Sequence, residues 1–261
     1  VNMSTIRNRM TKLNGGTPIS DGPFRNGSMY LTYTNEGMPI GAFWGYKTDG
    51  LIQTQEQLNA VKRADFQPNA ELGDVLFVDT NGDGKLDSSD RCMIGNPIPD
   101  IIYGINMGMA WKGFDLNLQF GGTIGNQIFN AMRYYTYFPN DITNKDRALM
   151  NYWTPNNTNT DIPRLTATDV NDNDRFSDMY VENGTYFRLR NAQLGYTLPA
   201  SLTQRIKLQK VRFYVSGQNL FTISSYSGMD PEVGQSSSLS RGIDYGIYPP
   251  VSYTHLRAHE T

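Results

Sequence analysis

The sequence predicts an all-β fold, an antiparallel, up-and-down segment of a transmembrane β-barrel with long extracellular loops. Three observations predict it. Residues 103–122 form two alternating strands joined by a minimal turn. Two further segments downstream repeat the alternation. The connections sort into very short and very long ones, as they do in outer-membrane barrels.

The strand pair reads YGINMGMAWKGFDLNLQFGG. A tight turn at Lys112-Gly113 sets Trp111 opposite Phe114, and the same register matches apolar residues further along. The remaining expected pairs are Met109 with Leu116 and Met107 with Leu118. Each strand runs about nine or ten residues with aromatic residues at its ends, which is the length and composition of a membrane-spanning β-strand.

Two later segments are expected to be strands as well. Residues 211–218 alternate strictly, whereas residues 185–198 change phase in the middle, which predicts a β-bulge near Arg190-Asn191. Weaker alternation predicts strands within residues 2–11, 28–34 and 42–46.

The connections differ greatly in length. Lys112-Gly113 and residues 199–210 are short, the latter with a helical turn, whereas residues 47–100, 123–184 and 224–248 are long and polar. In a meander, alternate connections lie at the same end, so the three long segments should gather at one end. Structureless loops of this length argue against a compact soluble domain.

Composition excludes several classes of function. The 23 Lys and Arg residues nearly balance the 25 Asp and Glu residues, so a nucleic-acid partner is not expected. Cys92 is the single cysteine, so no internal disulfide is possible, and no apolar run is long enough for a transmembrane helix. Both histidines lie in residues 251–261, which leaves histidine-based catalysis or zinc binding without support upstream.

Both ends of the chain look unusual. Val1 begins in mid-pattern without a signal peptide, so we expect the chain to be a fragment. Residues 251–261, VSYTHLRAHET, show neither alternation nor capping. We interpret them as a non-native adapter or assembly tail and exclude them from the fold, an ordinary polar tail being the alternative.

Taken together, these segments resemble the SusC/RagA-like TonB-dependent outer-membrane transporters. The resemblance covers nearly all of residues 2–248 in the family's order and spacing. The stretches that carry it are GMPIGAFWGYKTDG (37–50), DTNGDGKLDSSDRCMIGNPIPD (79–100), the strand pair, NYWTPNN (151–157) with IPR (162–164), YFRLRNAQLGYTLP (186–199) and VRFYVSGQNLFTISSYSGMDPEV (211–233).

The resemblance implies a large plugged barrel of which residues 1–250 are the C-terminal part. It implies a non-enzymatic importer in a Gram-negative outer membrane that takes up glycans, oligosaccharides or peptides. The implied partners are a SusD-like surface lipoprotein, the TonB complex through regions outside this chain, the ligand, and outer-membrane lipid. No cofactor is required.

One loop fits the spacing of a structural calcium site. Oxygen ligands recur through a twelve-residue loop with a turn-making Gly84 at its centre. The candidate ligands are Asp79, Asn81, Asp83, Lys85 through its carbonyl, Asp87 and Asp90. The alternative is a loop of Asx turns that caps itself, because Asp90 replaces the usual Glu and no helix pair flanks the loop.

Aromatic residues gather in the longest loop. Trp153, Tyr135 and Tyr137 are candidate substrate contacts, since rings beside amides and carboxylates suit sugar binding. The alternative, favoured for Trp153, is that such rings anchor the loop to the barrel rim. Other aromatic residues near strand ends predict an interfacial girdle: Phe43, Trp44, Tyr46, Trp111, Phe114 and Tyr196.

Three arginines on strands, Arg188, Arg190 and Arg212, are expected to face a polar lumen and to pair with plug or wall carboxylates. Two other classes of protein stay open. One is a secreted calcium-stabilised β-sandwich that binds carbohydrate, and the other is an extracellular glycosidase, for which no carboxylate pair with the required geometry is apparent.

Overall fold

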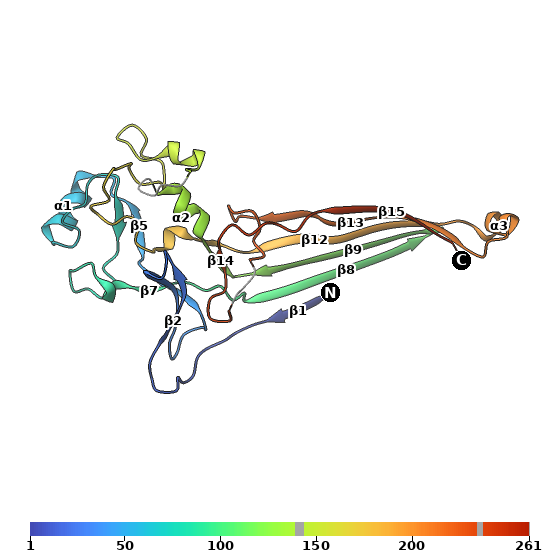
Figure 1. The fold of residues 1–261 in the computed structure, drawn as a ribbon, viewed down its shortest axis with the longest axis horizontal. Helices are drawn as coiled ribbons and strands as arrows, with labels where there is room; N and C mark the ends of the chain where they lie inside the picture. Colours follow the sequence, from blue (N-terminus) through green and yellow to red (C-terminus); the bar gives the residue numbers. More distant parts are fainter. Residues whose placement is uncertain (139–143, 234–236, 261) are drawn as a thin grey trace.

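The computed structural model describes residues 1–138, 144–233 and 237–260. A long, narrow sheet extends from one end of the molecule, and a broad assembly of loops, short strands and helices forms the other end (Figure 1). We call this assembly the loop cluster; it comprises the described residues of 12–100, 125–185 and 225–250. The sheet and the loop cluster are built on different principles.

The long sheet has six strands in the order β1-β8-β9-β12-β13-β15, and every neighbouring pair is antiparallel. From β8 onward, the strands of this sheet lie side by side in the same order in which they occur along the chain. This arrangement is an up-and-down meander. Its strands are β1 (Asn2–Thr5), β8 (Ile101–Trp111), β9 (Phe114–Ile124), β12 (Tyr186–Thr197), β13 (Val211–Ser224) and β15 (Tyr253–Glu260).

The register predicted for the strand pair is confirmed. Trp111 pairs with Phe114, and the pairing continues through Met109 with Leu116 and Met107 with Leu118. Lys112 and Gly113 both have positive φ, 45° and 87°. Two such residues in succession are what a two-residue type I′ hairpin turn requires, and glycine adopts the second conformation without strain.

The phase change in the next strand is a β-bulge, as expected. β12 shifts register between Leu189 and Asn191 against both of its neighbours, β9 and β13. The short connection after it carries the expected helical turn, α3 (Ala200–Thr203), followed by the 3-10 turn η4 (Gln204–Ile206). Figure 1 shows this turn and the Lys112-Gly113 hairpin at the end of the sheet that is remote from the loop cluster.

One face of the long sheet is apolar and uncovered. None of the hydrophobic cores formed by the described residues includes its side chains. Met107 is 56% exposed, Trp111 66% and Phe213 46%. Among the described residues, no second layer packs on this face as one would in a β-sandwich. Among the same residues, no helix has the length and hydrophobicity needed to cross a membrane.

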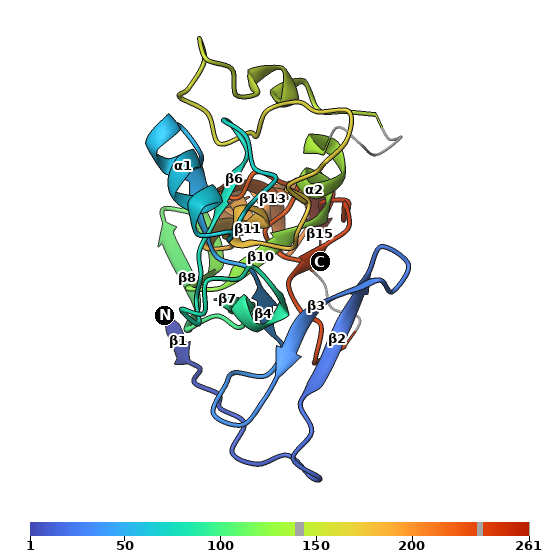
Figure 2. The same cartoon turned by 90° about the vertical axis from the view of Figure 1, so that its left-hand side faces the viewer.

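The loop cluster, which faces the viewer in Figure 2, contains three small sheets. The first is four-stranded: β2 (Ile19–Phe24), β3 (Met29–Thr34), β4 (Ala42–Gly45) and β7 (Cys92–Gly95). The second pairs β5 (Thr48–Leu51) with β6 (Val75–Phe77). In the third, β10 (Gln127–Asn130) lies between antiparallel β11 (Val181–Asn183) and parallel β14 (Ile243–Asp244).

Two α-helices belong to the loop cluster. α1 (Gln55–Arg63) begins at a capping box in which Thr54 and Gln57 satisfy each other's backbone N–H groups. α2 (Ala131–Tyr137) begins at Asn130, whose side chain accepts a hydrogen bond from the N–H of Arg133. The 3-10 turns are η1 (Ser88–Asp90), η2 (Arg147–Asn151) and η3 (Asp178–Tyr180).

The loop cluster has its own hydrophobic cores, which corrects the expectation of structureless polar loops. The largest core joins Phe24, Phe43, Phe129 and Phe176, which come from four segments far apart in the sequence. Two smaller cores lie around Val75 and around Ile52. Each loop alone carries too little apolar surface to form a core, and only the association of the loops completes one.

The predicted aromatic girdle stays a prediction for three of its residues and is wrong for the other three. Trp111, Phe114 and Tyr196 lie at the remote end of the long sheet, and the last two rings are in contact. Phe43 is completely buried in the largest core, and Trp44 stacks on Tyr33. Tyr46 packs beside the core around Val75. Phe43 and Trp44 lie in β4 and Tyr46 comes directly after it, and β4 belongs to the loop cluster, not to the long sheet.

The ends of the sheet also differ from expectation. β1 covers only Asn2–Thr5 of the predicted segment. Residues 251–261 are expected to lie outside the fold, but β15 (Tyr253–Glu260) pairs with β13 from Val211 to Gln218. The pairing involves backbone N–H and C=O groups, which any sequence supplies, so an exposed strand edge can recruit a segment that lacks a strand pattern.

Candidate ligand-binding site in the loop cluster

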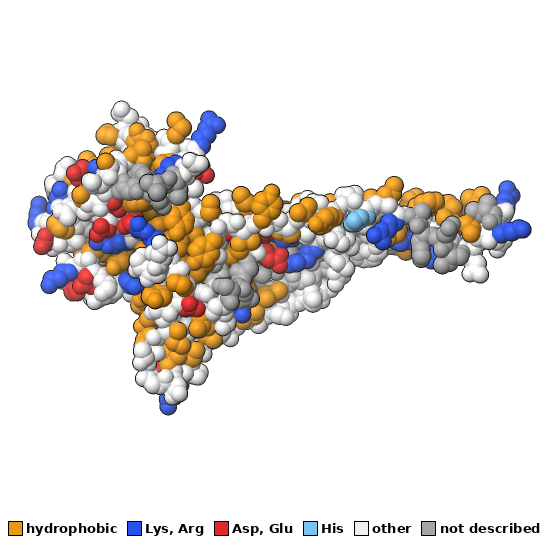
Figure 3. Space-filling view, in the orientation of Figure 1, with side chains coloured by type: hydrophobic (Ala, Val, Ile, Leu, Met, Phe, Trp, Pro, Cys, Tyr) orange, Lys and Arg blue, Asp and Glu red, His pale blue; other side chains and the backbone are white. Residues whose placement is uncertain are grey.

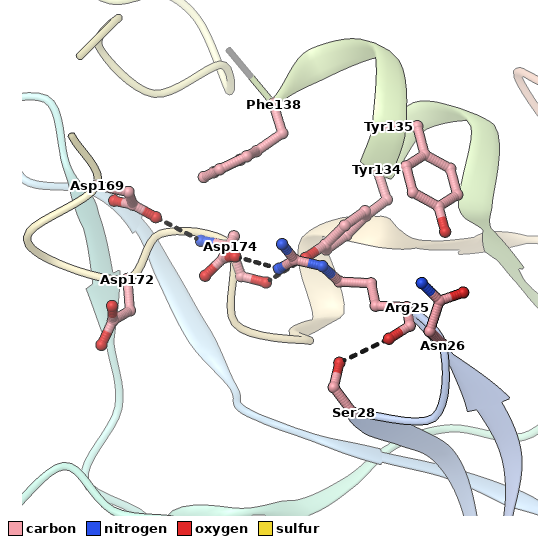
Figure 4. A pocket seen from close by; sticks show the side chains of 9 residues that line it. All are labelled: Arg25, Asn26, Ser28, Tyr134, Tyr135, Phe138, Asp169, Asp172 and Asp174. Atoms are coloured by element: carbon pink, nitrogen blue, oxygen red, sulfur yellow. Dashed lines mark hydrogen bonds and ion pairs between the residues drawn. The ribbon is translucent and has the colours of Figure 1, made fainter. Parts of the chain in front are cut away.

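A cavity of about 550 Å³ opens in the loop cluster. Figure 4 shows Asp169 and Asp172 on one side of it, the rings of Tyr134 and Tyr135 on the other, and Arg25 between them. Nine described residues line it: Arg25, Asn26, Ser28, Tyr134, Tyr135, Phe138, Asp169, Asp172 and Asp174. Its volume lies in the range of ordinary small-ligand sites.

The turn between β2 and β3 brings a basic side chain into the cavity. Arg25 and Asn26 both adopt positive φ there, 49° and 56°. Nη1 of Arg25 donates to Oδ2 of Asp174 at 2.5 Å and to the hydroxyl of Tyr134 at 3.0 Å. The guanidinium carbon also lies 5.9 Å from the centre of the Tyr134 ring. The cation is therefore held by a carboxylate and an aromatic ring together.

In residues 171–174, amide side chains that point into the core alternate with carboxylate side chains that line the cavity. The amides of Asn171 and Asn173 are buried and bind the backbone of Val75 in β6. The N–H of Val75 donates to Oδ1 of Asn173 at 2.9 Å. Nδ2 of Asn171 donates to the carbonyl of Val75. Asp172 and Asp174, the alternating neighbours, line the cavity. The buried amides therefore anchor the acidic segment to a core strand.

Asp169 is half-buried in the wall of the cavity. Its Oδ2 accepts a hydrogen bond of 3.0 Å from the backbone N–H of Asp174. Burial raises the pKa of the Asp169 carboxyl, the backbone N–H groups of Asn173 and Asp174 lower it, and the negative charges of Asp174 and Asp172 raise it further. The net pKa lies above the usual value, mainly because burial makes ionisation of Asp169 less favourable than in water.

Helix α2 and the residue after it supply the aromatic wall. Tyr134 is buried and donates its hydroxyl to the carbonyl of Asp174 at 3.0 Å, whereas Tyr135 and Phe138 are half-buried. Burial raises the pKa of the Tyr134 hydroxyl, so it stays protonated and can act as this donor. Rings with partly open faces beside carboxylates can bind either cations or sugar C–H groups.

The structure distributes the three predicted aromatic contacts over different surroundings. Tyr135 lines the cavity and packs against Phe24. Tyr137 lies under the guanidinium of Arg133 and lines a separate cavity of about 380 Å³. Trp153 is only 6% exposed, and its indole N–H donates to Oε1 of Gln53 at 2.8 Å.

Trp153 therefore has a packing role in the core around Val75. Gly73, which has positive φ, lies so close to the indole that any side chain there would overlap the ring. The alternative given at the outset, that this ring anchors its loop, describes the arrangement better than stacking on a ligand, although the anchor is a core of the loop cluster rather than the barrel rim.

The loop predicted to bind calcium is closed by its own side chains. Asp79 accepts backbone N–H groups from Gly82 and Gly84, Asn81 accepts from Asp83, and Asp83 accepts from Lys85. Asp87 caps η1 by accepting from Ser89. Hydrogen bonding by Gly84 lowers the pKa of Asp79, and hydrogen bonding by Ser89 lowers that of Asp87.

Asp90, the expected twelfth-position ligand, is buried and accepts from the N–H groups of Thr80 and Asp87. Among the described residues, no three His, Cys, Asp or Glu side chains are arranged to hold a metal ion. This arrangement favours the self-capped loop of Asx turns. Calcium binding stays a prediction.

The three strand arginines pair with carboxylates of this chain. Arg188 is 3% exposed and binds Asp230 at 2.5 Å and Glu232 at 2.9 Å, and Arg190 shares Glu232 at 3.1 Å. Arg212 of β13 binds Asp115 of β9, across the intervening strand β12, at 2.5 Å. Asp230 and Glu232 follow β13, so the first pairs tie the loop after β13 to the sheet. These two partners lie 42 and 44 residues from Arg188, so no local pattern in the sequence reveals them.

The acidic lining of the cavity was also missed. Its only signal in the sequence is the run DVNDND at residues 169–174, in which carboxylates and amides alternate. Arg25 has no local signal at all, because its partner Asp174 is 149 residues away.

Comparison with curated proteins finds several TonB-dependent receptors. The chain is 37% identical over 96% of its length to TonB-dependent receptor P3 of Formosa agariphila, and 30% identical over 82% of its length to receptor P26 of the same organism. It is 28% identical over 95% of its length to TonB-dependent receptor SusC of Bacteroides thetaiotaomicron. It spans about a quarter of the first relative, 25%, and 22% of the other two. No protein-family model matches the chain.

Solved structures of the RagAB peptide importer share the fold. The chain superposes on the open-open state with a TM-score of 0.69 and 24% identity, over 98% of its own length and 25% of that chain. For the closed-closed state the TM-score is 0.62 and the identity 26%, over 87% of this chain and 23% of the other.

Proposed function

Since the chain belongs to the SusC/RagA-like TonB-dependent receptors, we propose that it supplies part of the wall and extracellular loops of an importer that takes up nutrients across a Gram-negative outer membrane. The long sheet would form barrel wall, and the loop cluster would lie at its extracellular mouth. Import would be powered through TonB by regions of the receptor outside this chain.

One observation carries this proposal. The long sheet leaves a continuous apolar face uncovered while its opposite face carries polar side chains such as Asp115, Asn117 and Arg212. Exposing Met107, Met109 and Trp111 to water would be unfavourable, whereas hydrocarbon would solvate them. The space-filling view in Figure 3 shows hydrophobic side chains along the length of the sheet.

Site-specific fluorescence in the full receptor tests the orientation of the sheet. Cys92 is first replaced by Ser, and single cysteines are then introduced at Met107 on the apolar face and at Asn117 on the polar face. In proteoliposomes, a fluorophore at residue 107 should be quenched by brominated lipid and one at residue 117 by aqueous iodide. A cysteine at the exposed Met150 of the loop cluster is the water-facing control. Iodide quenching at residue 107 would contradict the proposal.

Uptake by cells tests the activity itself. A strain that lacks the receptor should take up less of its labelled nutrient from a panel of oligosaccharides and oligopeptides, and the intact receptor should restore uptake. The same loss should appear when TonB is removed. A receptor whose removal changes uptake of no member of the panel would argue against import of either class.

We also propose that a SusD-like lipoprotein docks on the loop cluster and delivers a glycan or a peptide. Exposed apolar side chains of the loop cluster support this, including Met150, Met229 and Tyr248. Replacing Met150 and Met229 by Ser should weaken copurification of the lipoprotein, while replacing the exposed Lys62 on α1 by Ser should not. Unchanged recovery in the double variant would place the interface elsewhere.

Structural calcium is retained as a proposal with a direct test. The candidate ligands are those of the loop from Asp79 to Asp90. If the ion binds there, calcium should raise the melting temperature of the receptor relative to EGTA, and Asp79→Ala with Asp83→Ala should abolish the shift. Equal melting temperatures in calcium and EGTA would remove the proposal.

A further inference from the structure

We infer that the end of the long sheet remote from the loop cluster binds the headgroups of anionic phospholipids. The site consists of four basic residues, which we call the basic tip: Lys112, Arg205, Lys207 and Lys210. The inference rests on the proposed function, because it takes the apolar face of the long sheet to lie against lipid. It adds a partner at the opposite end from the loop cluster, in the leaflet that faces the periplasm.

Two short connections that lie against each other bring the basic tip together. Lys112 belongs to the turn between β8 and β9, and the other three residues belong to the connection between β12 and β13. The backbone N–H of Thr197 donates to the carbonyl of Gly113 at 2.8 Å, which joins the two connections. All four basic residues are exposed, and Figure 3 shows blue side chains at this end of the molecule.

The positive charge of the basic tip is not balanced locally. Residues 110–115 and 196–212 contain one acidic residue, Asp115, which Arg212 binds at 2.5 Å. None of the four residues of the basic tip forms an ion pair with another described residue. Residues 251–261 add one Arg and one Glu, which cancel. In the loop cluster, by contrast, acidic residues outnumber basic ones. The excess of positive charge is therefore particular to this end, and it favours an anionic partner.

The basic tip is continuous with the apolar face of the sheet. The last aromatic residues of that face lie side by side, since Trp111 pairs with Phe114 and Phe114 pairs with Tyr196. The ammonium of Lys112 lies 4.8 Å from the centre of the Trp111 ring. A cation beside an aromatic ring at the end of an apolar band is typical of the level at which hydrocarbon meets lipid headgroups.

A phospholipid matches both parts of this surface in one molecule. Its acyl chains would cover exposed apolar side chains such as Met109 and Trp111, and its phosphate would lie beside the cations. A free phosphate ion would use the cations alone, and a soluble acidic protein would leave the adjacent apolar side chains exposed. Several basic residues at a membrane surface favour a headgroup with a net negative charge, such as phosphatidylglycerol, over zwitterionic phosphatidylcholine.

Lipid-specific quenching in proteoliposomes of the full receptor tests the inference. Trp111→Cys, in a receptor otherwise free of cysteine, carries a fluorophore beside the basic tip. Titration with phosphatidylglycerol or phosphatidylcholine whose chains are brominated gives the relative association constant of the two lipids at this position. It should favour phosphatidylglycerol about fivefold or more, which is the effect of about one basic residue near a membrane surface. High salt should reduce this preference, and a fluorophore at residue 107, further from the basic tip, should show a smaller one.

Two variants locate the effect. Replacing all four residues of the basic tip by Gln should bring the relative association constant to about one. The same change in charge in the loop cluster should leave the preference intact; it replaces the exposed Lys12, Lys47, Lys62 and Arg63 by Gln. Equal association of the two lipids beside the unchanged basic tip would overturn the inference, and this comparison alters no charged residue. A preference that persists without the basic tip would overturn it as well.

Inorganic phosphate distinguishes a lipid headgroup from the free ion. Added at constant ionic strength, it should leave the preference for phosphatidylglycerol unchanged, because the acyl chains hold the lipid against the apolar face. Loss of the preference in inorganic phosphate would assign the basic tip to the free ion and overturn the inference.

The outcome separates this inference from the proposed function. If brominated lipid quenches a fluorophore at residue 107 but the two lipids associate equally at residue 111, the inference is wrong and the membrane wall stands. If brominated lipid of neither kind quenches residue 107, the proposed wall is wrong, and the inference that depends on it is overturned too.

Discussion

The long sheet and the loop cluster use their apolar residues in opposite ways. The sheet is a single layer whose apolar side chains stay exposed, with Met109 at 68%, whereas the loop cluster buries Phe43 and Phe129 completely in a core of its own. A soluble domain requires the second arrangement, and a membrane wall requires the first. One short chain therefore contains elements suited to two different surroundings.

The same contrast appears in the ion pairs. Arg188, at the end of the sheet next to the loop cluster, is nearly inaccessible and is shared between two carboxylates. Arg212, further along the sheet, has one partner and is about a quarter exposed. A buried charge that loses its partner is costly, whereas a partly hydrated pair contributes little.

The largest effect is expected from truncation in the core of the loop cluster. Phe129→Ala should destabilise the cluster by about 4 kcal/mol, because it removes a ring packed against Phe24 and Phe176. Met107→Ala on the open face of the sheet should cost less than about 1 kcal/mol, since it leaves no cavity. Urea unfolding of the receptor, followed by the fluorescence of Trp153, measures the difference. Similar urea unfolding midpoints for the two variants would show that truncation costs the same stability in both regions.

The next effect concerns the buried ion pairs. Arg188→Gln should destabilise the attachment of the loop after β13 by about 3 kcal/mol, because Asp230 would lose its partner while buried. Arg212→Gln should cost less than about 1 kcal/mol. Limited proteolysis between β13 and β14 reports the attachment directly. Equal cleavage rates in the two variants would show that burial does not distinguish these pairs.

A charge on the apolar face should have a smaller but specific effect. Met107→Arg should destabilise insertion by about 2 kcal/mol, since a cation in hydrocarbon is unfavourable. The matched change Met150→Arg, at an exposed position of the loop cluster, should be neutral. The measurement is the fraction of receptor recovered in folded form from outer membranes. Normal recovery of the Met107→Arg variant would indicate that water, not lipid, contacts this face.

The smallest effect is a local response to acid in the self-capped loop. The pKa of Asp79 is lower in the folded protein than in the unfolded chain, so its contribution is present at neutral pH and is lost as the pH falls through the folded-state value. Exchange of the Gly82 and Gly84 amides should therefore accelerate, beyond the intrinsic trend, below about pH 4. Asp79→Asn should flatten this dependence. A dependence unchanged in that variant would assign it to another group.

How far the sequence could be interpreted differs between the two regions. In the sheet, alternation and turn chemistry are local, so the hairpin register, the bulge near Arg190 and the positions of β12 and β13 were all predictable. In the loop cluster, the strands β5, β6, β10 and β14 are four residues or shorter and carry no clear period. Their pairing depends on partners distant in the sequence, which a single sequence does not reveal.

The sequence by itself determined the family, the meander and its two faces, because each follows from neighbours in the chain and from a period of two residues. Only the tertiary structure decided that Trp153 is buried, that Arg25 meets Asp174, and that Asp169, Asp172 and Asp174 line one cavity. These contacts join segments that lie 100 or more residues apart, such as Gln53 and Trp153. They form because the loops can bury their apolar residues only by packing against one another.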